Sequence, residues 1–193
     1  MAQLILGLLV FLGVHSISIV APAARDRWAA RLGANAWRGL YSVVSLAGFV
    51  LLVRGYAVAR HSPVLLYVAP GWMRHVTLLL MLPVFPLWLA SQLPGRIKAA
   101  VGHPMLTAIM IWSFAHLLAN GTLADVLLFG GFLLWSVLDR LSFLRRAERP
   151  LRMAPPGRWN DPIAIVVGLG IYAAVLLWLH GWIIGVPLVG ALG

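Results

Sequence analysis

Histidine is the residue type in this chain that is best suited to hold a metal or a cofactor. The sequence has six histidines, five carboxylates and no cysteine, so thiolate ligands, thiol nucleophiles and disulfides are excluded. Two of the histidines, His15 and His116, lie well inside long apolar runs. Ionisable groups are costly in a hydrocarbon environment and usually serve a function there. These two residues are therefore the first candidates for chemistry.

The helical neighbours of both histidines are largely apolar or aromatic. On a helix, His15 shares a face with Phe11 at i−4, and His116 shares a face with Trp112 and Asn120 at i±4. Neutral imidazole is a ligand of haem iron, and apolar surroundings suit a porphyrin. A histidine in such a run more often forms a hydrogen bond across a helix interface. Spacing alone leaves both roles open.

The remaining polar residues of the apolar runs have plainer interpretations. His103 stands beside Pro104 and is expected at a helix boundary. Tyr41 and Ser45 begin a small polar face that is typical of helix packing. The sequence contains no glycine-rich phosphate loop, no H-E-x-x-H motif and no nucleophile elbow. Familiar hydrolytic and nucleotide-binding chemistry is therefore not indicated.

Apolar runs of membrane-spanning length must position these residues. The chain is 62% hydrophobic and 10% charged, against about 45–50% and about 25% in soluble domains. A helix needs about 20 apolar residues to cross a bilayer. We predict an all-α fold, a polytopic integral membrane helix bundle of about six transmembrane helices, in which residues 1–193 form a single domain within the lipid bilayer. The six runs are Met1–Ala21, Leu40–Ala57, His75–Leu93, Pro104–Ala119, Thr122–Leu138 and Pro162–Leu179.

The basic residues are distributed unevenly between the gaps that separate these runs. Alternate gaps carry twelve of the fifteen Lys and Arg residues, and the remaining gaps carry three. Because positive loops stay in the cytoplasm, we expect a bacterial inner-membrane protein with both termini in the periplasm and with residues 139–161 as an Arg-rich cytoplasmic loop. This topology accounts for the net charge of +10, and we expect no nucleic-acid partner.

The connection between the fourth and fifth runs carries turn signals. Asn120-Gly121 predicts a tight turn in which Gly121 takes the left-handed conformation that ends a helix. Thr122 and Asp125 have the spacing of a capping box. We therefore expect these two runs to form an antiparallel hairpin.

Two residue pairs that end in proline predict helix starts. In Asp161-Pro162, the aspartate is expected as the N-cap and the proline as the first helical residue. His103-Pro104 is expected to open its helix in a similar way.

Four motifs, taken in order, resemble the NnrU family of bacterial membrane proteins. The resemblance extends from the first run through the fifth, and the motifs are specific as a set. They are Gly13-Val14-His15-Ser16, Arg38-Gly39-Leu40-Tyr41-Ser42, His103-Pro104-Met105-Leu106 and Trp112-Ser113-Phe114-Ala115-His116-Leu117-Leu118-Ala119-Asn120-Gly121.

The resemblance implies a haem-linked function. NnrU proteins are linked to nitrite and nitric oxide reduction, and a related domain occurs in the 15-cis-zeta-carotene isomerase of plants and cyanobacteria, which carries haem b on histidine ligands. Its ligand motifs match His15 and His116, and His103 matches the histidine thirteen residues before the second ligand. Tyr41, Trp112 and Asn120 lie in the same motifs and are assigned to the surroundings of the cofactor.

A bis-histidine iron would suit electron transfer or redox-gated isomerisation. The carotenoid substrate does not carry over to this chain, and an enzyme of this kind would take a lipophilic small molecule. Whether the chain is an enzyme is left open.

Depth along the helices is a difficulty for the pair His15 and His116. In the predicted topology their depths differ by about 15 Å, whereas two axial nitrogens of one iron lie about 4 Å apart. His15 with His103 fits the predicted depths better.

Two other functions stay open. His103-Pro104 before an apolar hairpin also resembles isoprenylcysteine-type membrane methyltransferases, but Gly102 stands where they usually have arginine, and their paired glutamates are missing. The third hypothesis is a non-enzymatic assembly or maturation factor for a denitrification enzyme.

Overall fold

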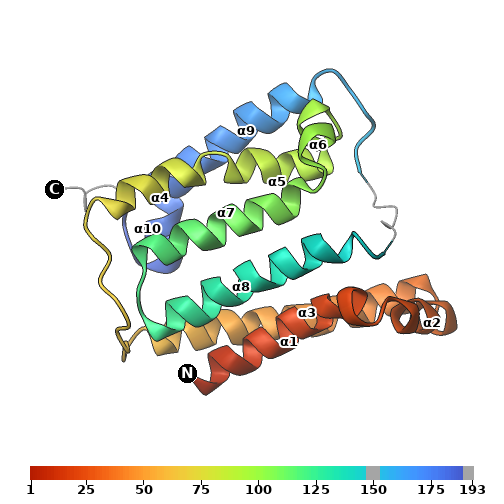
Figure 1. The fold of residues 1–193 in the computed structure, drawn as a ribbon, viewed down its shortest axis with the longest axis horizontal. Coiled ribbons are helices and arrows are strands. Elements are labelled where there is room, and N and C mark those ends of the chain that lie inside the picture. The colour runs from red at the N-terminus through yellow and green to blue at the C-terminus, as the bar shows by residue number, and fades with distance from the viewer. Residues whose placement is uncertain (147–152, 189–193) are drawn as a thin grey trace. The chain divides into compact units, whose positions relative to one another are not determined.

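A computed structural model describes residues 1–146 and 153–188, and the elements in these ranges are helices (Figure 1). The helices fall into two units. The first comprises the described residues of Met1–Met73 and His116–Glu148, and the second comprises those of Arg74–Ala115 and Arg149–Gly193. The all-α fold class predicted from the sequence is confirmed.

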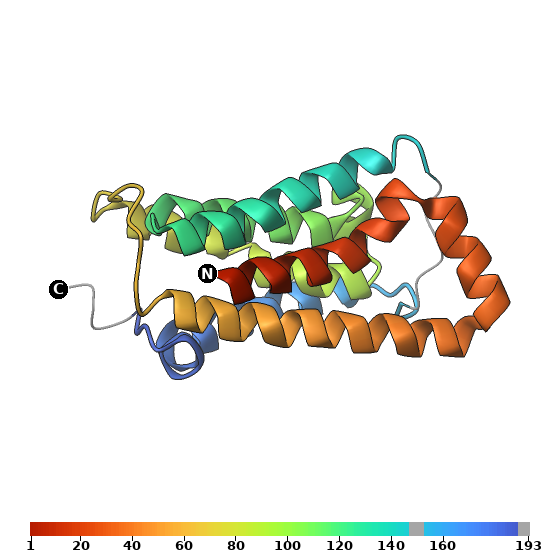
Figure 2. The ribbon, with the colours of Figure 1, turned by 90° about the horizontal axis from the view of Figure 1, so that it is seen from below.

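The first unit is built on an antiparallel pair of long helices, α1 (Ala2–Val20) and α3 (Ala34–Ala59). The short helix α2 (Pro22–Leu32) connects them at one end (Figure 2). Their backbones touch at Gly7 and Gly55, where an added Cβ would lie 2.3 Å from the backbone nitrogens of Leu52 and Leu4. Close approach through small residues is the usual way in which helices pack in a membrane.

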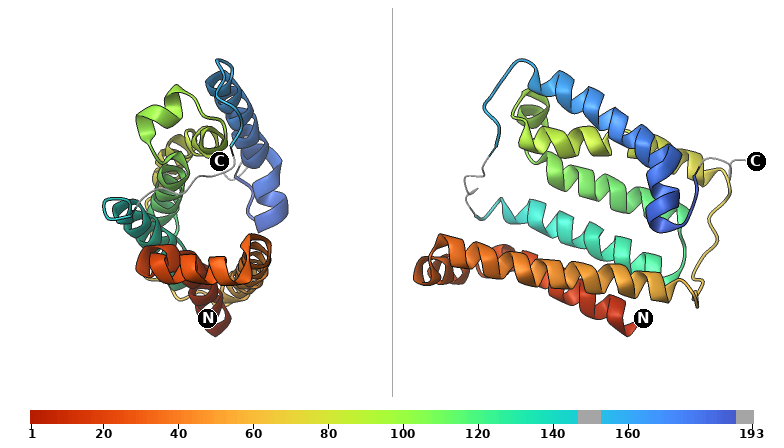
Figure 3. Two further views of the ribbon diagram at one scale, coloured as in Figure 1. Left: turned by 90° about the vertical axis from the view of Figure 1, so that its right-hand side faces the viewer. Right: turned by 180° about the vertical axis from the view of Figure 1, so that it is seen from behind.

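Helix α8 (Leu123–Ser142) completes the first unit and runs parallel to α1. Phe11 of α1 packs against Phe132 of α8 with ring centroids 5.8 Å apart. Tyr56 of α3 donates a 2.6 Å hydrogen bond to the carboxylate of Asp125 near the start of α8. The view from behind shows α8 beside α3 (Figure 3).

The start of α8 is the predicted capping box. Thr122 is the N-cap, and its Oγ1 accepts a hydrogen bond from the backbone N–H of Asp125 at 3.2 Å. The Asp125 carboxylate in turn accepts from the backbone N–H of Thr122 at 3.0 Å. α7 (Pro104–Ala119) ends three residues before α8 begins, so the predicted tight connection is also confirmed.

The left-handed conformation predicted for Gly121 was wrong. The described glycines with positive φ are Gly33, Gly102 and Gly185, and Gly121 is not among them. Gly121 is required by close approach instead, because an added Cβ would lie 2.0 Å from the carbonyl oxygen of Tyr67. Its own carbonyl accepts backbone hydrogen bonds from Leu66 and Tyr67.

The second unit contains short helices packed against one long one. α5 (Val84–Gln92) packs on α9 (Asn160–Ala174) at Gly168, where an added Cβ would lie 2.5 Å from the backbone nitrogen of Pro86. A small core joins Val84 and Leu87 of α5 to Ala108 of α7. The other elements of this unit are α4 (Met73–Met81), α6 (Arg96–Val101), the π-helix η1 (Val175–Leu179) and α10 (His180–Ile184).

Of the two helix starts predicted at prolines, one is confirmed and the other is wrong. Pro104 is the first residue of α7, as expected. The prediction that Asp161 is an N-cap was wrong, because α9 begins at Asn160 with Trp159 as its N-cap. The Asp161 carboxylate instead accepts hydrogen bonds from the backbone N–H groups of Arg96 and Ile97, at 2.8 and 3.2 Å. It therefore caps α6, a helix more than sixty residues earlier in the chain.

Four helical stretches within the described residues are long and apolar enough to cross a membrane: α1 (Ala2–Val20), α3 (Ala34–Ala59), α4 together with α5 (Met73–Gln92), and α9 through α10 (Asn160–Ile184). α7 is apolar but shorter. α8 is long enough, but any stretch of bilayer length within it carries three charged residues, Asp125, Asp139 and Arg140. These apolar helices are those of a multi-pass membrane protein. The count of about six spans stays a prediction, as does the sidedness of the termini.

The predicted Arg-rich loop at residues 139–161 begins inside a helix, since α8 continues to Ser142. Residues 147–152, with Arg149 and Arg152, lie outside the described residues. Arg146, which lies within the predicted loop, is ion-paired with Asp139.

Candidate functional site

His15 lies in the last third of α1 and has one ring nitrogen engaged. Its Nδ1 lies 2.6 Å from the carbonyl oxygen of Phe11, one turn earlier in the helix. A carbonyl oxygen only accepts, so Nδ1 must carry a proton and the neutral ring has its lone pair on Nε2. Nε2 has no hydrogen-bond partner among the described residues. This orientation leaves one imidazole nitrogen available to a ligand.

Aromatic rings from three helices surround the His15 imidazole. The Phe11 ring lies 4.3 Å from it on α1, the Tyr41 ring 5.3 Å from it on α3, and the Trp135 ring 6.0 Å from it on α8. Tyr41 and Trp135 present edge-on contacts, with interplanar angles of 62° and 90°. The sequence motifs include Tyr41, but they do not include Trp135.

Trp135 also carries an unsatisfied polar group. Its indole Nε1 is buried and has no hydrogen-bond partner in the described part of the chain. Buried donors in folded proteins are nearly always paired. An acceptor supplied by a bound molecule would therefore fit beside His15.

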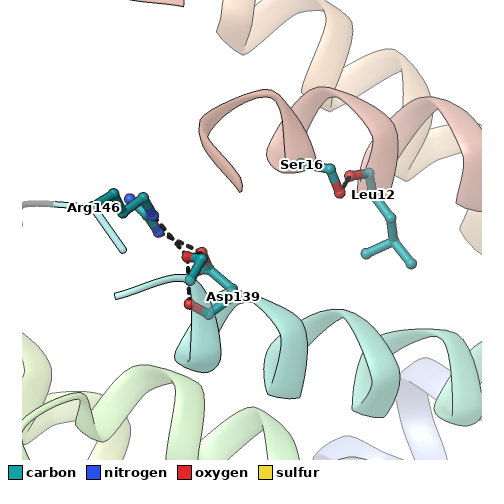
Figure 4. Close-up of polar contacts among 5 residues, drawn as sticks. Leu12, Ser16, Asp139 and Arg146 are labelled. Atoms are coloured by element: carbon teal, nitrogen blue, oxygen red, sulfur yellow. Dashed lines mark hydrogen bonds and ion pairs between the residues drawn. The ribbon is translucent and has the colours of Figure 1, made fainter. Parts of the chain in front are cut away.

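One turn further along α8, a buried ion pair neutralises Asp139. Arg146 contacts the Asp139 carboxylate (Figure 4). Both side chains are at most 15% exposed. Ser142 joins them, because its Oγ accepts a 2.7 Å hydrogen bond from Nε of Arg146 and donates to the Asp139 backbone carbonyl at 2.7 Å, with the Asp139 carboxylate Oδ1 at 3.3 Å. The signal in the sequence is the i, i+7 spacing of opposite charges, which our sequence analysis missed. The pairing compensates the charge of a carboxylate that lies one helical turn from Trp135.

His116 lies in the last turn of α7 and has a different environment. Its ring stacks on Phe129 of α8, with centroids 4.6 Å apart and an interplanar angle of 26°. Asn120 donates from Nδ2 to the backbone carbonyl of His116 at 2.8 Å. This contact serves the helix end, because it satisfies a terminal carbonyl.

The two histidines contact α8 at different levels. His15 contacts Trp135 and His116 contacts Phe129. Six helical residues separate these positions, which corresponds to about 9 Å along the axis. Axial nitrogens on one iron lie about 4 Å apart. The structure therefore brings each histidine to the bundle of the first unit without bringing the two to one level.

The chain matches the NnrU protein family model over residues 3–188. It is a member of the NnrU family. No curated protein and no solved structure matches the chain.

The NnrU motif residues of the second unit have structural contacts of their own. His103 precedes α7, and its carbonyl accepts from the backbone N–H of Thr107 at 3.1 Å. Trp112 packs against the core formed by Val84, Leu87 and Ala108. In this NnrU chain, the described residues contain no group of three or more histidine or carboxylate side chains that could hold a metal ion.

Proposed function

We propose that this NnrU-family chain binds haem b within its first unit, with His15 as an axial ligand. The observation that carries the proposal is the free Nε2 of an imidazole whose Nδ1 is held by the Phe11 carbonyl. Histidine ligands of metals nearly always donate their second nitrogen to a carbonyl or carboxylate, which fixes the tautomer and the ring direction. His15 has that arrangement within an apolar helix.

The residues around His15 are of the types that pack against a porphyrin. Phe11, Tyr41 and Trp135 supply flat apolar surface, and the unpaired Trp135 Nε1 supplies a donor. Haem would supply one-electron redox chemistry at this position. Family membership then supports a redox role, either in a reaction of a lipophilic small molecule or in support of nitrite and nitric oxide reduction.

Optical spectra of purified variants test the proposal. The wild-type chain, expressed with haem supplied, is expected to show a Soret band, and His15→Ala is expected to lose it. His61→Ala is the matched control, because His61 is an exposed histidine just after α3 and should leave the spectrum unchanged. A wild-type chain without a Soret band would overturn the proposal and would leave the assembly-factor or methyltransferase hypothesis.

The same spectra assign the second axial position. If His116 supplies it, His116→Ala converts a six-coordinate iron into a five-coordinate one and retains the haem. If His103 supplies it, His103→Ala produces that change and His116→Ala does not. Loss of haem in His116→Ala but not in His15→Ala would show that His15 is the wrong ligand.

A further inference from the structure

An apolar groove runs along the first unit between α1, α2 and α3. Its volume is about 510 Å³, which lies within the range of roughly 300–1,000 Å³ that is typical of ligand sites. Trp28 and Leu32 of α2 form one side, and Trp37 and Tyr41 of α3 form part of the other. Tyr41 is the only lining side chain with an oxygen atom. The groove therefore suits a hydrocarbon chain rather than a polar molecule.

Gly13 of α1 is the one glycine among the lining residues. A Cβ added at Gly13 would meet no atom within 4 Å. In contrast, the space beside Gly7 and Gly55 is occupied by the backbone of the neighbouring helix. The absence of a side chain at Gly13 thus leaves space in the groove that no described helix occupies.

Four arginines of α2 and α3 lie close in the sequence to the groove-lining residues of these helices, and we call them the rim of the groove. The guanidinium of Arg25 lies over the ring of Trp37, a groove-lining residue, at 5.6 Å from the ring centroid. Arg25 is also ion-paired with Asp26 at 3.0 Å. Arg27, Arg31 and Arg38 are exposed and form no ion pair within the described residues. Residues 22–38 contain these four arginines and a single acidic residue.

The position of α2 places this charge at the membrane surface. α2 has 11 residues, which is too short to cross a bilayer, and it joins the ends of α1 and α3 (Figure 2). Trp28 and Trp37 have the amphipathic rings that concentrate at the headgroup level. Arginines at that level attract anionic headgroups. The groove and its charged rim therefore match the two parts of one amphiphile.

We propose that this groove binds one acyl chain of an anionic phospholipid, whose phosphate is held by Arg27, Arg31 and Arg38. A zwitterionic phospholipid could place a chain in the groove, but its own cation would oppose the three arginines. A soluble anion would use the arginines and leave the groove empty. The proposal does not depend on haem, because none of its residues is a proposed haem ligand, although Tyr41 belongs both to the groove and to the surroundings of His15.

Photo-crosslinking tests the proposal on the full chain in detergent. The probe is phosphatidylglycerol with a diazirine in one acyl chain, and the matched probe is phosphatidylcholine with the same chain. Phosphatidylglycerol should label the groove residues of α1 and α3 severalfold more strongly, as mapped by mass spectrometry. Added salt should reduce this preference, because the arginines are exposed and their charge is screened.

Two variants test the groove and the rim arginines separately. Gly13→Leu should lower groove labelling by both probes about tenfold, which corresponds to displacing about two methylene groups of the bound chain. Gly170→Leu on α9 is the control, because a Cβ there also meets no atom within 4 Å. The triple variant R27Q/R31Q/R38Q should reduce phosphatidylglycerol labelling to the phosphatidylcholine level and leave the latter unchanged.

Three results would overturn the proposal. The first is equal groove labelling by the two probes, which indicates ordinary annular lipid. The second is unchanged labelling in both Gly13→Leu and the triple variant. The third is a groove whose residues are labelled by neither probe, which would indicate that something other than lipid, such as a second copy of the chain, covers it. Because the triple variant changes only exposed side chains, it tests the site even if Gly13→Leu fails to fold.

Discussion

Gly121 and the carbonyl of Tyr67 are in direct backbone contact, so that a methyl group on Gly121 would lie 2.0 Å from that oxygen. The contact joins the turn between α7 and α8 to the segment that follows α3. Leu65 and Thr122 form an isolated antiparallel bridge beside it, and the Tyr67 hydroxyl reaches the carbonyl of Asn120 at 2.7 Å. The turn is thus held by a segment more than fifty residues away.

We predict that Gly121→Ala destabilises the protein by about 1–3 kcal/mol, the usual cost of overpacking a tight contact. The reason is steric, since the backbone at Gly121 does not have a positive φ. Gly130→Ala is the control, because a Cβ there meets nothing within 4 Å and alanine favours a helix. Thermal unfolding in detergent measures both. Equal stability of the Gly121→Ala variant and the wild type would refute the contact.

Tyr67 should make the stability of this turn depend on pH. Burial raises the pKa of its phenol above the ordinary value of 10.0, and the charge of Asp125 adds to the effect. The folded state then keeps a proton that the unfolded state loses, so the stabilisation is complete below the ordinary pKa and is lost as the pH rises through the raised pKa.

The comparison of wild type with Tyr67→Phe isolates this effect. At neutral pH, Tyr67→Phe should unfold at a lower temperature, because the hydrogen bonds to the helix end are lost. The difference should shrink above a pH of about 10, where the phenol ionises. A difference that is constant across that range would exclude the phenol as its source.

Asp161→Ala should destabilise the second unit by about 1 kcal/mol, the typical cost of losing a helix cap. The Asp161 carboxylate accepts from Arg96 and Ile97 at the start of α6. Asp161→Asn retains one side-chain oxygen and should recover part of the loss. Unfolding temperatures of the two variants provide the measurement. If Asp161→Ala and Asp161→Asn both unfold at the wild-type temperature, Asp161 does not cap α6.

Membrane sidedness can be measured cleanly because the chain has no cysteine. Single cysteines at Ser62 and Arg158, both exposed, sample a gap predicted outside and a gap predicted in the cytoplasm. In intact cells, a membrane-impermeant maleimide should label Ser62→Cys, and Arg158→Cys should react only with a permeant reagent. The reverse labelling would show that the topology is inverted.

Local sequence signals predicted much of the helical architecture. Apolar runs of bilayer length determine that the chain is an α-helical membrane protein, because backbone groups in lipid must be satisfied within helices. Pro104 starts α7 and the Thr122–Asp125 box starts α8, since both signals act within a single helical turn. His15 was likewise predicted as a candidate, because an ionisable residue in an apolar run is visible without a structure.

The tertiary structure decided whatever depends on distant partners. Asp161 looks like the cap of its own helix, but it caps α6 because α5 and α9 pack together and bring the two helix starts side by side. Trp135 joins the surroundings of His15 only because α8 runs parallel to α1. The levels of His15 and His116 follow from how α8 is placed against each of them. Spacing along one helix specifies a face, whereas the partner of that face is set by packing between helices, which short sequence motifs do not encode.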